Sequence, residues 1–228
     1  MANILLGVTG SVAAIRTPAL FAELRQRGHP VKVVATQAAL YFFDPAALDP
    51  SRPERHPDLV IIDADEWPGR EQGKRYQRDD PVLHIELRKW ADLFVIAPLD
   101  ANTLAKLACG LADNCLTCVW RAWDFARPVI LVPAMNTLMW EHPLTCRHLG
   151  QIATDAGAGG TGGPPVLPGV GPDEIVAWIN QNCPRLRVVP PQSKRLACGD
   201  MGMGAMADLE AILAAVEGVS PRSRKANE

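Results

Sequence analysis

The 228-residue sequence lacks a strong net charge, a long apolar run and a basic leader. Its formal net charge is −2, and its basic residues are scattered apart from the tail 220–228 (SPRSRKANE), so nothing indicates a nucleic-acid or membrane surface. No stretch reaches the roughly 18 apolar residues of a membrane helix, and the start, MANILLGVTGSVAA, lacks the basic lead-in of a signal peptide. We therefore expect a cytoplasmic protein whose partners are small molecules or copies of itself.

The six cysteines do not form the pattern of a disulfide framework. The chain is not small, and its cysteines lie in apolar segments such as LACGLADNCLTCVW, so we expect reduced thiols. Cys115 and Cys118 form a C-x-x-C pair without the strand and turn of a redox motif. His142, Cys146 and His148 lack the ligand spacing of a tetrahedral metal site. The sequence therefore predicts no disulfides and no bound metal.

Apolar runs alternate with helical patterns along the chain. Its length and its 48% of hydrophobic residues favour one domain. We expect strands at 3–8, 31–36, 59–63, 93–98 and 128–135, helices at 81–92, 101–113, 115–124 and 208–219, and a helical pattern that runs through Arg27 and ends at Gly28. This order predicts an α/β fold with a doubly wound parallel sheet, flavodoxin-like or Rossmann-like, whose ligand lies beyond the carboxyl ends of the strands.

Two glycine-rich stretches interrupt the alternation. Residues 157–172 (GAGGTGGPPVLPGVGP) are dominated by Gly and Pro and predict a loop. Residues 195–208 (RLACGDMGMGAMAD) set Cys198 among glycines and methionines, which favours a mobile flap or turn over a packed element. The expected domain covers 1–219, and the tail 220–228 is expected to be disordered.

The segment GVTGS joins the first predicted strand to the first helix. At this junction backbone N–H groups and the helix dipole can bind a phosphate, and Ser11 can cap the helix and bond an oxyanion. A purely structural turn with Ser11 as its cap is the alternative. The spacing is not G-x-G-x-x-G, and the second strand ends in Thr36 rather than in an acid that would hold a dinucleotide ribose. FMN therefore fits better than NAD, with Gly10, Ser11 and Thr36 as candidate ligands.

Polar residues follow two further strands at the same predicted edge. Pro98, Asn102 and Thr103 follow the strand at 93–98, and Asn136 follows the strand at 128–135 and leads to Met139. Each of these polar side chains taken alone is explained equally well as a helix cap. Their gathering at one edge favours a site, so Pro98, Asn102 and Thr103 join the predicted FMN ligands.

Five motifs give the chain a family resemblance. GVTGSVAA, DPVLHIELRKWADL, APLDANTLAKLACGLADNCLTCVWRAWD, PAMNTLMWEHP and LACGDMGMGAMA resemble, in order, the signatures of the phosphopantothenoylcysteine decarboxylase family of flavin-containing cysteine decarboxylases. The resemblance implies a flavodoxin-like, FMN-binding homotrimer that acts in coenzyme A synthesis. Its expected reaction converts 4'-phospho-N-pantothenoyl-L-cysteine to 4'-phosphopantetheine and CO2.

The resemblance also assigns roles to residues. The substrate thiol is oxidised to a thioaldehyde that accepts the electrons of decarboxylation, and the product is then re-reduced, so no nicotinamide is needed. His84 would assist thiol deprotonation, although a lone histidine beside an apolar helix face is more often structural. Cys198, on a flap that closes over the substrate, would donate a proton. Asn136 would hold the substrate carboxylate beside Met139. Substrate phosphate would face Arg88 or Lys89, for which a solvated surface charge is the alternative.

Three rival functions remain open at the level of sequence. A peptidyl-cysteine decarboxylase would use the same flavin chemistry on the carboxyl end of a peptide. A flavin prenyltransferase shares the fold but has no need of both His84 and Cys198. A non-catalytic regulator of a protein phosphatase is the third possibility, but such relatives tend to carry long acidic extensions, whereas the tail here is short and slightly basic.

Overall fold

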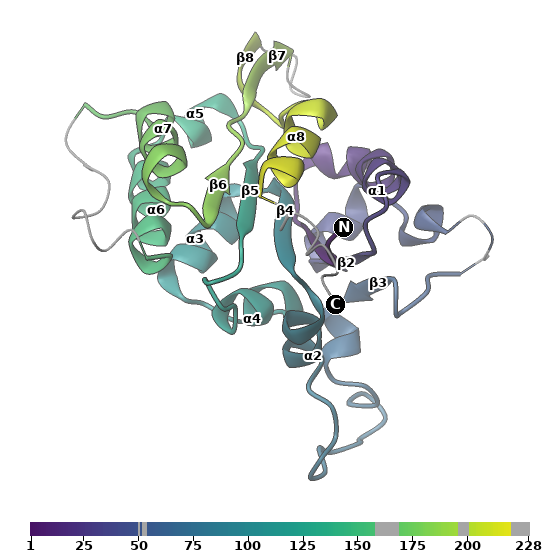
Figure 1. Ribbon diagram of the computed structural model, residues 1–228. Coiled ribbons are helices and arrows are strands. Elements are labelled where there is room, and N and C mark those ends of the chain that lie inside the picture. Colours follow the sequence, from purple (N-terminus) through teal and green to yellow (C-terminus); the bar gives the residue numbers. More distant parts are fainter. Residues whose placement is uncertain (50, 52–53, 158–168, 196–200, 220–228) are drawn as a thin grey trace, which may run out of the picture.

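The computed structural model describes residues 1–49, 51, 54–157, 169–195 and 201–219. In this part of the chain a parallel sheet runs through the centre of the molecule in the order β3-β2-β1-β4-β5-β6 (Figure 1). Its strands are β1 (Ile4–Val8), β2 (Val31–Ala35), β3 (Val60–Ile62), β4 (Leu93–Leu99), β5 (Val129–Pro133) and β6 (Leu186–Val188). All five pairings are parallel. The predicted doubly wound α/β fold is therefore confirmed.

The strand order reverses direction between β1 and β4. The chain builds β1, β2 and β3 outward to one side, then returns to β4 and builds β5 and β6 to the other side. A crevice opens beyond the carboxyl ends of the strands at such a reversal, because the loops on its two sides diverge. The loops after β1 and β4 therefore lie where a ligand is expected.

Helices cover both faces of the sheet. Alternate strand residues point to opposite faces, so Leu5 and Phe94 belong to one core and Ile4 and Val95 to the other. The Leu5 core also includes side chains of α2 (Leu83–Trp90), α3 (Ala101–Cys109), α4 (Cys115–Arg121), α6 (Pro143–Asp155) and α7 (Pro172–Asn182). The Ile4 core includes those of α1 (Thr17–Gln26) and α8 (Leu209–Val219).

Short helical turns follow several strands. They are η1 (Val12–Arg16) after β1, η2 (Gln37–Tyr41) and η3 (Pro45–Leu48) after β2, η4 (Asp63–Glu66) after β3, and the four-residue helix α5 (Thr137–Trp140) after β5. Because they begin at the carboxyl ends of parallel strands, they shape the edge at which the ligand is expected.

The region between α5 and the hairpin is more ordered than its sequence suggested. It holds α6, α7 and β6, and α7 begins at Pro172, the last residue of the predicted loop. Gly157 and Gly169 have φ angles of +93° and +90°, which favour glycine. The part of the predicted loop at 158–168, and the predicted disordered tail at 220–228, lie outside the described residues.

The predicted flap is in part a β-hairpin. Strand β7 (Gln192–Arg195) pairs antiparallel with β8 (Met201–Ala205), and the hairpin stands at the top of the molecule (Figure 1). The sequence favoured a mobile flap or turn over a packed element, whereas Met201–Ala205 form a strand. The reason is that a partner strand supplies the backbone hydrogen bonds that a glycine-rich segment needs in order to stay extended. Cys198 lies outside the described residues.

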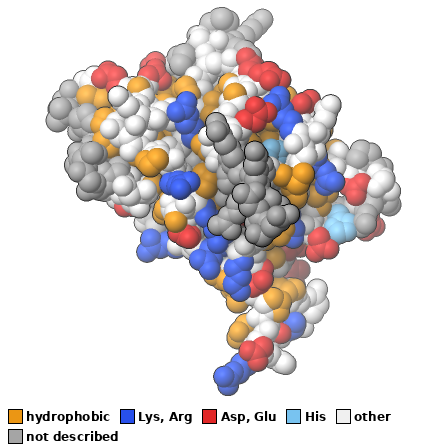
Figure 2. All heavy atoms as spheres, in the orientation of Figure 1, with side chains coloured by type: hydrophobic (Ala, Val, Ile, Leu, Met, Phe, Trp, Pro, Cys, Tyr) orange, Lys and Arg blue, Asp and Glu red, His pale blue; other side chains and the backbone are white. Residues whose placement is uncertain are grey.

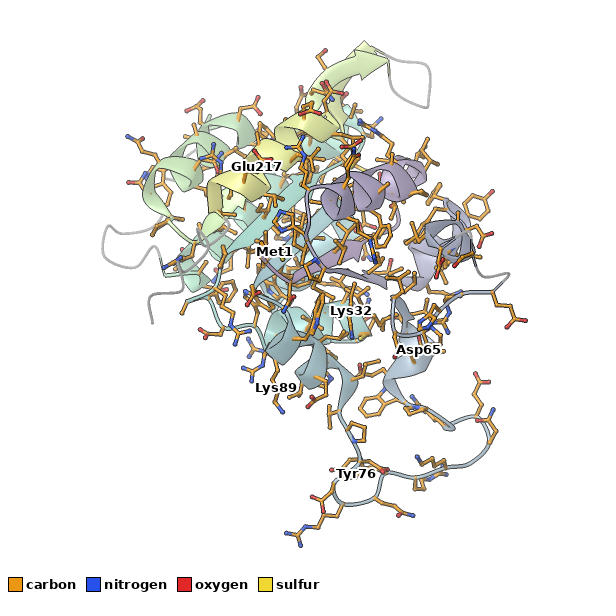
Figure 3. The ribbon with its side chains drawn as sticks, turned by 45° about the vertical axis from the view of Figure 1, so that its right-hand side comes forward. Met1, Lys32, Asp65, Tyr76, Lys89 and Glu217 are labelled. Atoms are coloured by element: carbon orange, nitrogen blue, oxygen red, sulfur yellow. The ribbon has the colours of Figure 1, made fainter. Side chains whose placement is uncertain are left out.

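A second projection leaves the body between η4 and α2. Residues 67–82 form a series of turns, with Asp65 at the root and Tyr76 near the far end (Figure 3). Lys and Arg side chains gather over α4 and α2 on the face shown in Figure 2, whereas acidic and basic side chains mix over α8. Among the described residues, every helix is too short or too polar to span a bilayer.

Candidate active site

A buried threonine ties together the loops after β1 and β4. The hydroxyl of Thr9 donates to the carbonyl oxygen of Pro98 at 2.9 Å and accepts the amide of Asp100 at 2.8 Å. The hydroxyl proton and one of the two lone pairs are thus used within the protein. The two loops form one rigid rim at the reversal of strand order, and Pro98 belongs to that rim.

Gly10 and Ser11 follow directly on this rim. A Cβ atom at Gly10 would lie 2.6 Å from Cβ of Ala38 and 3.3 Å from Oδ2 of Asp100, so a side chain there would displace the backbone of one loop. Ser11 caps η1 by accepting the amide of Ala13 at 3.3 Å, which leaves its hydroxyl proton to donate elsewhere. Close approach of the backbone and an outward donor are the features of an anion-binding loop.

Thr36 has a buried hydroxyl without a partner. Its amide donates to the carbonyl of Val8 at 3.0 Å, which places it beside the end of β1. Its Oγ1 is buried and lacks any hydrogen-bond partner within the described structure. A buried hydroxyl without a partner is costly, so its presence at this edge indicates a bond to a ligand.

The start of α3 is held by Asp100. Its carboxylate accepts the amide of Thr103 at 2.7 Å, and Thr103 is buried while Asn102 is exposed. Asp100 is therefore the cap of this helix, and Asn102 is available to a ligand. The alternative that Asn102 and Thr103 are helix caps is therefore incorrect, because the carboxylate of Asp100, the residue before the helix, accepts the amide that a cap would bind.

Asn136 stands at the carboxyl end of β5 and caps α5. Its side-chain oxygen accepts the amide of Leu138 at 2.9 Å, so its Nδ2 group is directed away from the helix backbone as a donor. The Met139 side chain beside it is exposed. A cap and a donor are compatible roles here, because they use different atoms of the same amide.

The hairpin is seated directly beside Asn136. The amide of Met135 donates to the carbonyl of Gly204 in β8 at 3.0 Å, and Gly204 has a φ angle of +139°. A Cβ atom at Gly204 would lie 2.0 Å from the carbonyl oxygen of Met135, so the two backbones meet without space for a side chain. The structure thus joins two of the predicted site segments, the one carrying Asn136 and the one leading to Cys198.

Beyond the hairpin, the chain is anchored to the first helical segment. The guanidinium of Arg16 donates to the carbonyl of Ala207 at 3.2 Å, and the Gln192 amide donates to the carbonyl of Met206 at 2.8 Å. The first bond fixes the chain after β8 to the body of the protein, and the second ties the two strands of the hairpin together at its base.

His84 belongs to a second cluster, on the β3 side of the sheet. Its Nδ1 contacts Oε1 of Glu66, the last residue of η4. The His84 side chain is 19% exposed and that of Glu66 only 3%. Sequence reasoning missed Glu66, which lies 18 residues from His84 in an irregular segment. It is one of three carboxylates within Asp63–Glu66, and no local pattern distinguishes it from the other two.

The turn that carries Glu66 is fastened to α4. Asp63 accepts the amides of Gln37 at 3.2 Å and Cys115 at 3.3 Å. Burial raises the pKa of the Asp63 carboxyl, although the two amides lower it. Burial and then the charge of Glu66 raise the pKa of the Cys115 thiol, which therefore stays protonated.

Arg88 and Lys89 have partners on the protein. The guanidinium of Arg88 reaches the carbonyl of Ala122 after α4 at 3.4 Å, and Lys89 pairs with Glu86 at 2.9 Å on the helix surface. Neither contact leads to the edge that carries Asn136. Their expected contact with a substrate phosphate stays a prediction.

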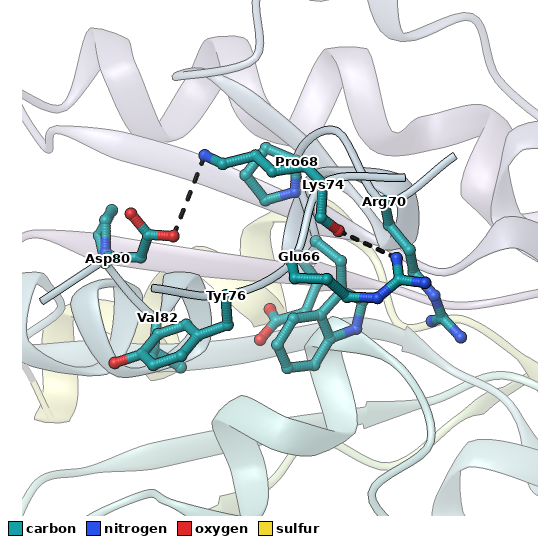
Figure 4. Close-up of a pocket in the computed structure, with 10 residues that line it drawn as sticks. Glu66, Pro68, Arg70, Lys74, Tyr76, Asp80 and Val82 are labelled. Carbon is teal, nitrogen blue, oxygen red and sulfur yellow. Dashed lines mark hydrogen bonds and ion pairs between the residues drawn. The ribbon is translucent and has the colours of Figure 1, made fainter. Parts of the chain in front are cut away.

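A cavity opens beside the histidine cluster. It has a volume of about 660 Å³ and lies between the root of the 67–82 projection and the segment before α2 (Figure 4). Its lining includes Glu66, Trp67, Arg70, Lys74 and Tyr76. An anionic, partly apolar molecule suits such a lining better than a cation does.

The two clusters are far apart within one chain. β3, which leads to Glu66, and β5, which leads to Asn136, are separated by four strand spacings. At about 4.8 Å for each spacing, their ends lie roughly 19 Å apart. In Figure 1, α2 accordingly lies low in the molecule, while α5 and the hairpin lie at the top. The strand order therefore holds the two clusters at separate places on the edge of a single chain.

Comparisons with known proteins place this architecture in a family. The flavoprotein family model matches residues 1–220. Phosphopantothenoylcysteine decarboxylase of Mus musculus is 45% identical over 218 residues, covering 95% of this chain and 86% of the mouse protein. The enzyme of the same name from Oryza sativa subsp. japonica is 43% identical, covering 90% of this chain and 75% of the rice protein.

Solved structures agree with these relatives. A PPC decarboxylase mutant complexed with pantothenoylaminoethenethiol has a TM-score of 0.71 and 40% identity, covering 94% of this chain and 96% of that one. The FMN-binding protein AtHal3 has a TM-score of 0.68 and 40% identity, covering 95% of each chain. The chain therefore belongs to the flavoprotein family, and within it to the phosphopantothenoylcysteine decarboxylases.

Proposed function

We propose that this protein is an FMN-dependent phosphopantothenoylcysteine decarboxylase. The proposed activity is that of a carboxy-lyase, which converts 4'-phospho-N-pantothenoyl-L-cysteine to 4'-phosphopantetheine and CO2 in coenzyme A synthesis. The names of the mouse and rice relatives, phosphopantothenoylcysteine decarboxylase, support the substrate and the loss of CO2. The observation that carries the proposal is the seating of the hairpin on Met135, which brings the segment leading to Cys198 against Asn136. The cytoplasmic location expected from the sequence stays a prediction.

The residues at the carboxyl edge fit FMN. Thr36 offers a buried hydroxyl without a partner, and Ser11 offers an outward hydroxyl proton at a glycine turn where backbone can approach a phosphate. The proposed set of ligands consists of Gly10, Ser11, Thr36, Pro98, Asn102 and Thr103. When bound, FMN supplies an acceptor and donor of two electrons, so that decarboxylation proceeds without a nicotinamide.

The protein's own residues bind the substrate and move protons. Asn136 donates through Nδ2 to the substrate carboxylate, because its oxygen is engaged by Leu138. Met139 packs against the apolar part of the substrate. His84 accepts the proton of the substrate thiol. The Cys198 thiol returns a proton to carbon once water is shut out, since an unperturbed thiol, with a pKa of about 8.5, is protonated at neutral pH.

A homotrimer would bring the two clusters together. Since His84 and Asn136 lie on strand ends roughly 19 Å apart, the histidine of one copy and the asparagine of another would have to meet at a shared site. Large apolar side chains beside the carboxyl edge are exposed, among them Ile15 at 60% and Leu138 at 77%. Such residues next to a site favour a surface that another copy covers.

The reaction is tested by mass spectrometry of 4'-phospho-N-pantothenoyl-L-cysteine incubated with pure protein and no nicotinamide. We expect loss of one CO2 with no net change in hydrogen content, giving 4'-phosphopantetheine. His84→Asn should stop turnover while the protein stays yellow, and Cys198→Ser should accumulate an oxidised enethiol product. Unchanged substrate in the presence of bound FMN would redirect the assignment to peptides with a carboxyl-terminal cysteine.

A further inference from the structure

A buried carboxylate lies behind His84, and the proposed reaction assigns it no step. One oxygen of Glu66, Oε1, contacts Nδ1 of His84, while Oε2 is buried without a hydrogen-bond partner among the described residues. The side chain is almost fully buried. The Cys115 thiol also interacts with this carboxylate, but a thiol is a weak donor. A buried carboxylate with so few partners is costly to the fold, and such groups concentrate at functional sites.

The turn that carries Glu66 is rigid. Asp65 accepts the amide of Ile62 at 2.8 Å and forms a two-pronged ion pair with Arg55 at 2.6 and 2.9 Å. At the start of the same turn, Asp63 is bonded to the first amide of α4. These bonds fix the backbone of the turn, so the Glu66 side chain projects toward His84 from a fixed position, which is how a preorganised supporting residue is held.

We infer that Glu66 is the positioning residue of His84, fixing the hydrogen of the imidazole on Nδ1 and leaving Nε2 as the base. This inference rests on the proposed role of His84. A neutral imidazole has one N–H and one lone pair, and the hydrogen bond made by one nitrogen decides which atom carries which. A carboxylate at Nδ1 accepts the N–H, so the lone pair is on Nε2.

The proton transfer then balances without any further group. The S–H bond of the substrate thiol breaks, an N–H bond forms at Nε2, and the substrate is left as a thiolate. The imidazolium that results carries its two N–H groups on opposite sides of the ring, and the negative charge of Glu66 stabilises it. The buried thiol of Cys115, which lies against Glu66, stays protonated and takes no part in this exchange.

The tautomer is a direct test. In ¹⁵N-histidine-labelled, FMN-loaded protein, long-range proton–nitrogen correlations report which ring nitrogen carries hydrogen, and the His84→Asn spectrum identifies the signal. We expect hydrogen on Nδ1 in the wild type. Glu66→Gln keeps an oxygen acceptor and should keep this tautomer, whereas Glu66→Leu should shift it toward the Nε2–H form. Hydrogen on Nε2 of the wild-type His84 would overturn the inference, whatever the variants do.

Kinetics supply the second test. Glu66→Gln, which loses only the charge, should lower kcat roughly tenfold, and Glu66→Leu roughly a hundredfold, with KM within about twofold. Glu86→Gln is the matched control, because it alters an exposed carboxylate on the helix of His84 and should leave kcat unchanged. A wild-type kcat in Glu66→Leu, which removes the acceptor for the imidazole N–H, would refute the inference. Full activity in His84→Asn would instead refute the proposed role of the histidine, and the tautomer measurement would still stand.

Discussion

Gly10, Thr36 and Gly204 are constrained by the atoms around them. Gly10 and Gly204 have neighbours at distances that no Cβ atom tolerates, and Thr36 buries a hydroxyl for which the described chain offers no partner. Substitutions at these two kinds of position should have opposite effects on the free energy of unfolding. A side chain added at either glycine lowers it, because the chain must move to make room, whereas removal of the unpartnered hydroxyl of Thr36 does not.

Gly204→Ala should detach the hairpin from Met135. The new Cβ would lie 2.0 Å from a carbonyl oxygen at a φ of +139°, so we expect a loss of roughly 1–3 kcal/mol in the free energy of unfolding. Decarboxylation should fall more than tenfold, because the segment leading to Cys198 is displaced. Chemical denaturation and steady-state rates measure the two effects.

Gly218→Ala is the control for that variant. Gly218 lies in α8 with nothing near its added Cβ, so alanine should raise stability by about 0.5–1 kcal/mol and leave the rate unchanged. Wild-type stability and rate in Gly204→Ala would show that the hairpin does not depend on this contact.

Thr36→Val should weaken FMN binding without harming the fold. The isosteric change removes a hydroxyl that would bond the cofactor, and a hydrogen bond to a charged group corresponds to roughly a tenfold or greater change in Kd. The apoprotein should be as stable as the wild type or slightly more so. Fluorescence titration of FMN and thermal unfolding of the apoprotein measure both.

Thr17→Val separates the two effects. Thr17 also buries a hydroxyl without a partner, but at the start of α1. Like Thr36→Val, the Thr17→Val variant should leave the apoprotein as stable as the wild type or slightly more so. Unlike Thr36→Val, it should leave the Kd of FMN unchanged. Equal Kd values for wild type and Thr36→Val would remove Thr36 from the ligand set.

Sequence reasoning located single residues well where a motif or strand end marked them. Gly10, Ser11 and Asn136 lie at the predicted edge because parallel strands end together. Glu66 was beyond its reach, since its contact with His84 depends on how an irregular segment folds back against α2. The path of that segment depends on tertiary contacts such as the ion pair between Asp65 and Arg55, and no local sequence pattern predicts such a contact.

At the scale of elements, Asp63 joins three of them. It follows β3, and its two oxygens accept the first amides of η2 and α4. An asparagine there has only one acceptor oxygen and would turn an NH2 group toward an amide donor. This junction holds the turn of Glu66 at the start of α4.

Asp63→Asn should lower the free energy of unfolding by roughly 1–3 kcal/mol, since one amide loses its acceptor. Burial raises the pKa of this carboxyl above its usual value of 3.8, so the folded wild type binds a proton more tightly than the unfolded chain. Its contribution to stability is thus full in acid and lost as the pH rises through the raised pKa. The advantage of wild type over variant should shrink upward from about pH 4.

Denaturant unfolding across that range checks the trend. Asp58→Asn is the control, because this carboxylate is 88% exposed and should change stability by less than about 0.5 kcal/mol at any pH. An advantage of the wild type over Asp63→Asn that grows with pH would contradict the assigned direction.

Strands could be predicted from the sequence where apolar residues follow one another without a break. The strands at 4–8, 93–99 and 129–133 are buried at every position, so their sequences are continuous apolar runs. Helices α6 and α7 were missed because the Gly/Pro-rich stretch between them dominates the composition of that region. The hairpin was read as a turn because glycine disfavours strands, and only the pairing of β8 with β7 overrides this preference.

At the scale of the whole molecule, the strand order separates the His84 cluster from Asn136, although the proposed reaction needs both at one site. The winding that creates the crevice between β1 and β4 also places Glu66 and Asn136 at the ends of β3 and β5. The turn of Glu66 is fixed by the bonds of Asp63 and Asp65, so the two strand ends stay roughly 19 Å apart within one chain. Assembly of copies is the way to complete a site that the proposed homotrimer offers.

Mixing two inactive variants tests this assembly. His84→Asn and Cys198→Ser should each form little 4'-phosphopantetheine alone. If a site draws its histidine from one copy and its cysteine from another, random assembly of equal amounts of the two variants would leave about a quarter of all sites complete and restore that share of activity. The variants are refolded together and the product is measured, with each variant refolded alone as the control.

The activity of the mixed variants can be interpreted only if the number of copies in each particle is known. Sedimentation should give three copies per particle, and native mass spectrometry of differently tagged variants should show mixed trimers. If mixed trimers form and stay as inactive as their parents, each site belongs to a single chain, and the hairpin must then reach across the sheet to His84. If the protein sediments as one copy, the homotrimer is refuted. Regained activity that rises with the fraction of mixed particles would establish that the site is shared between copies.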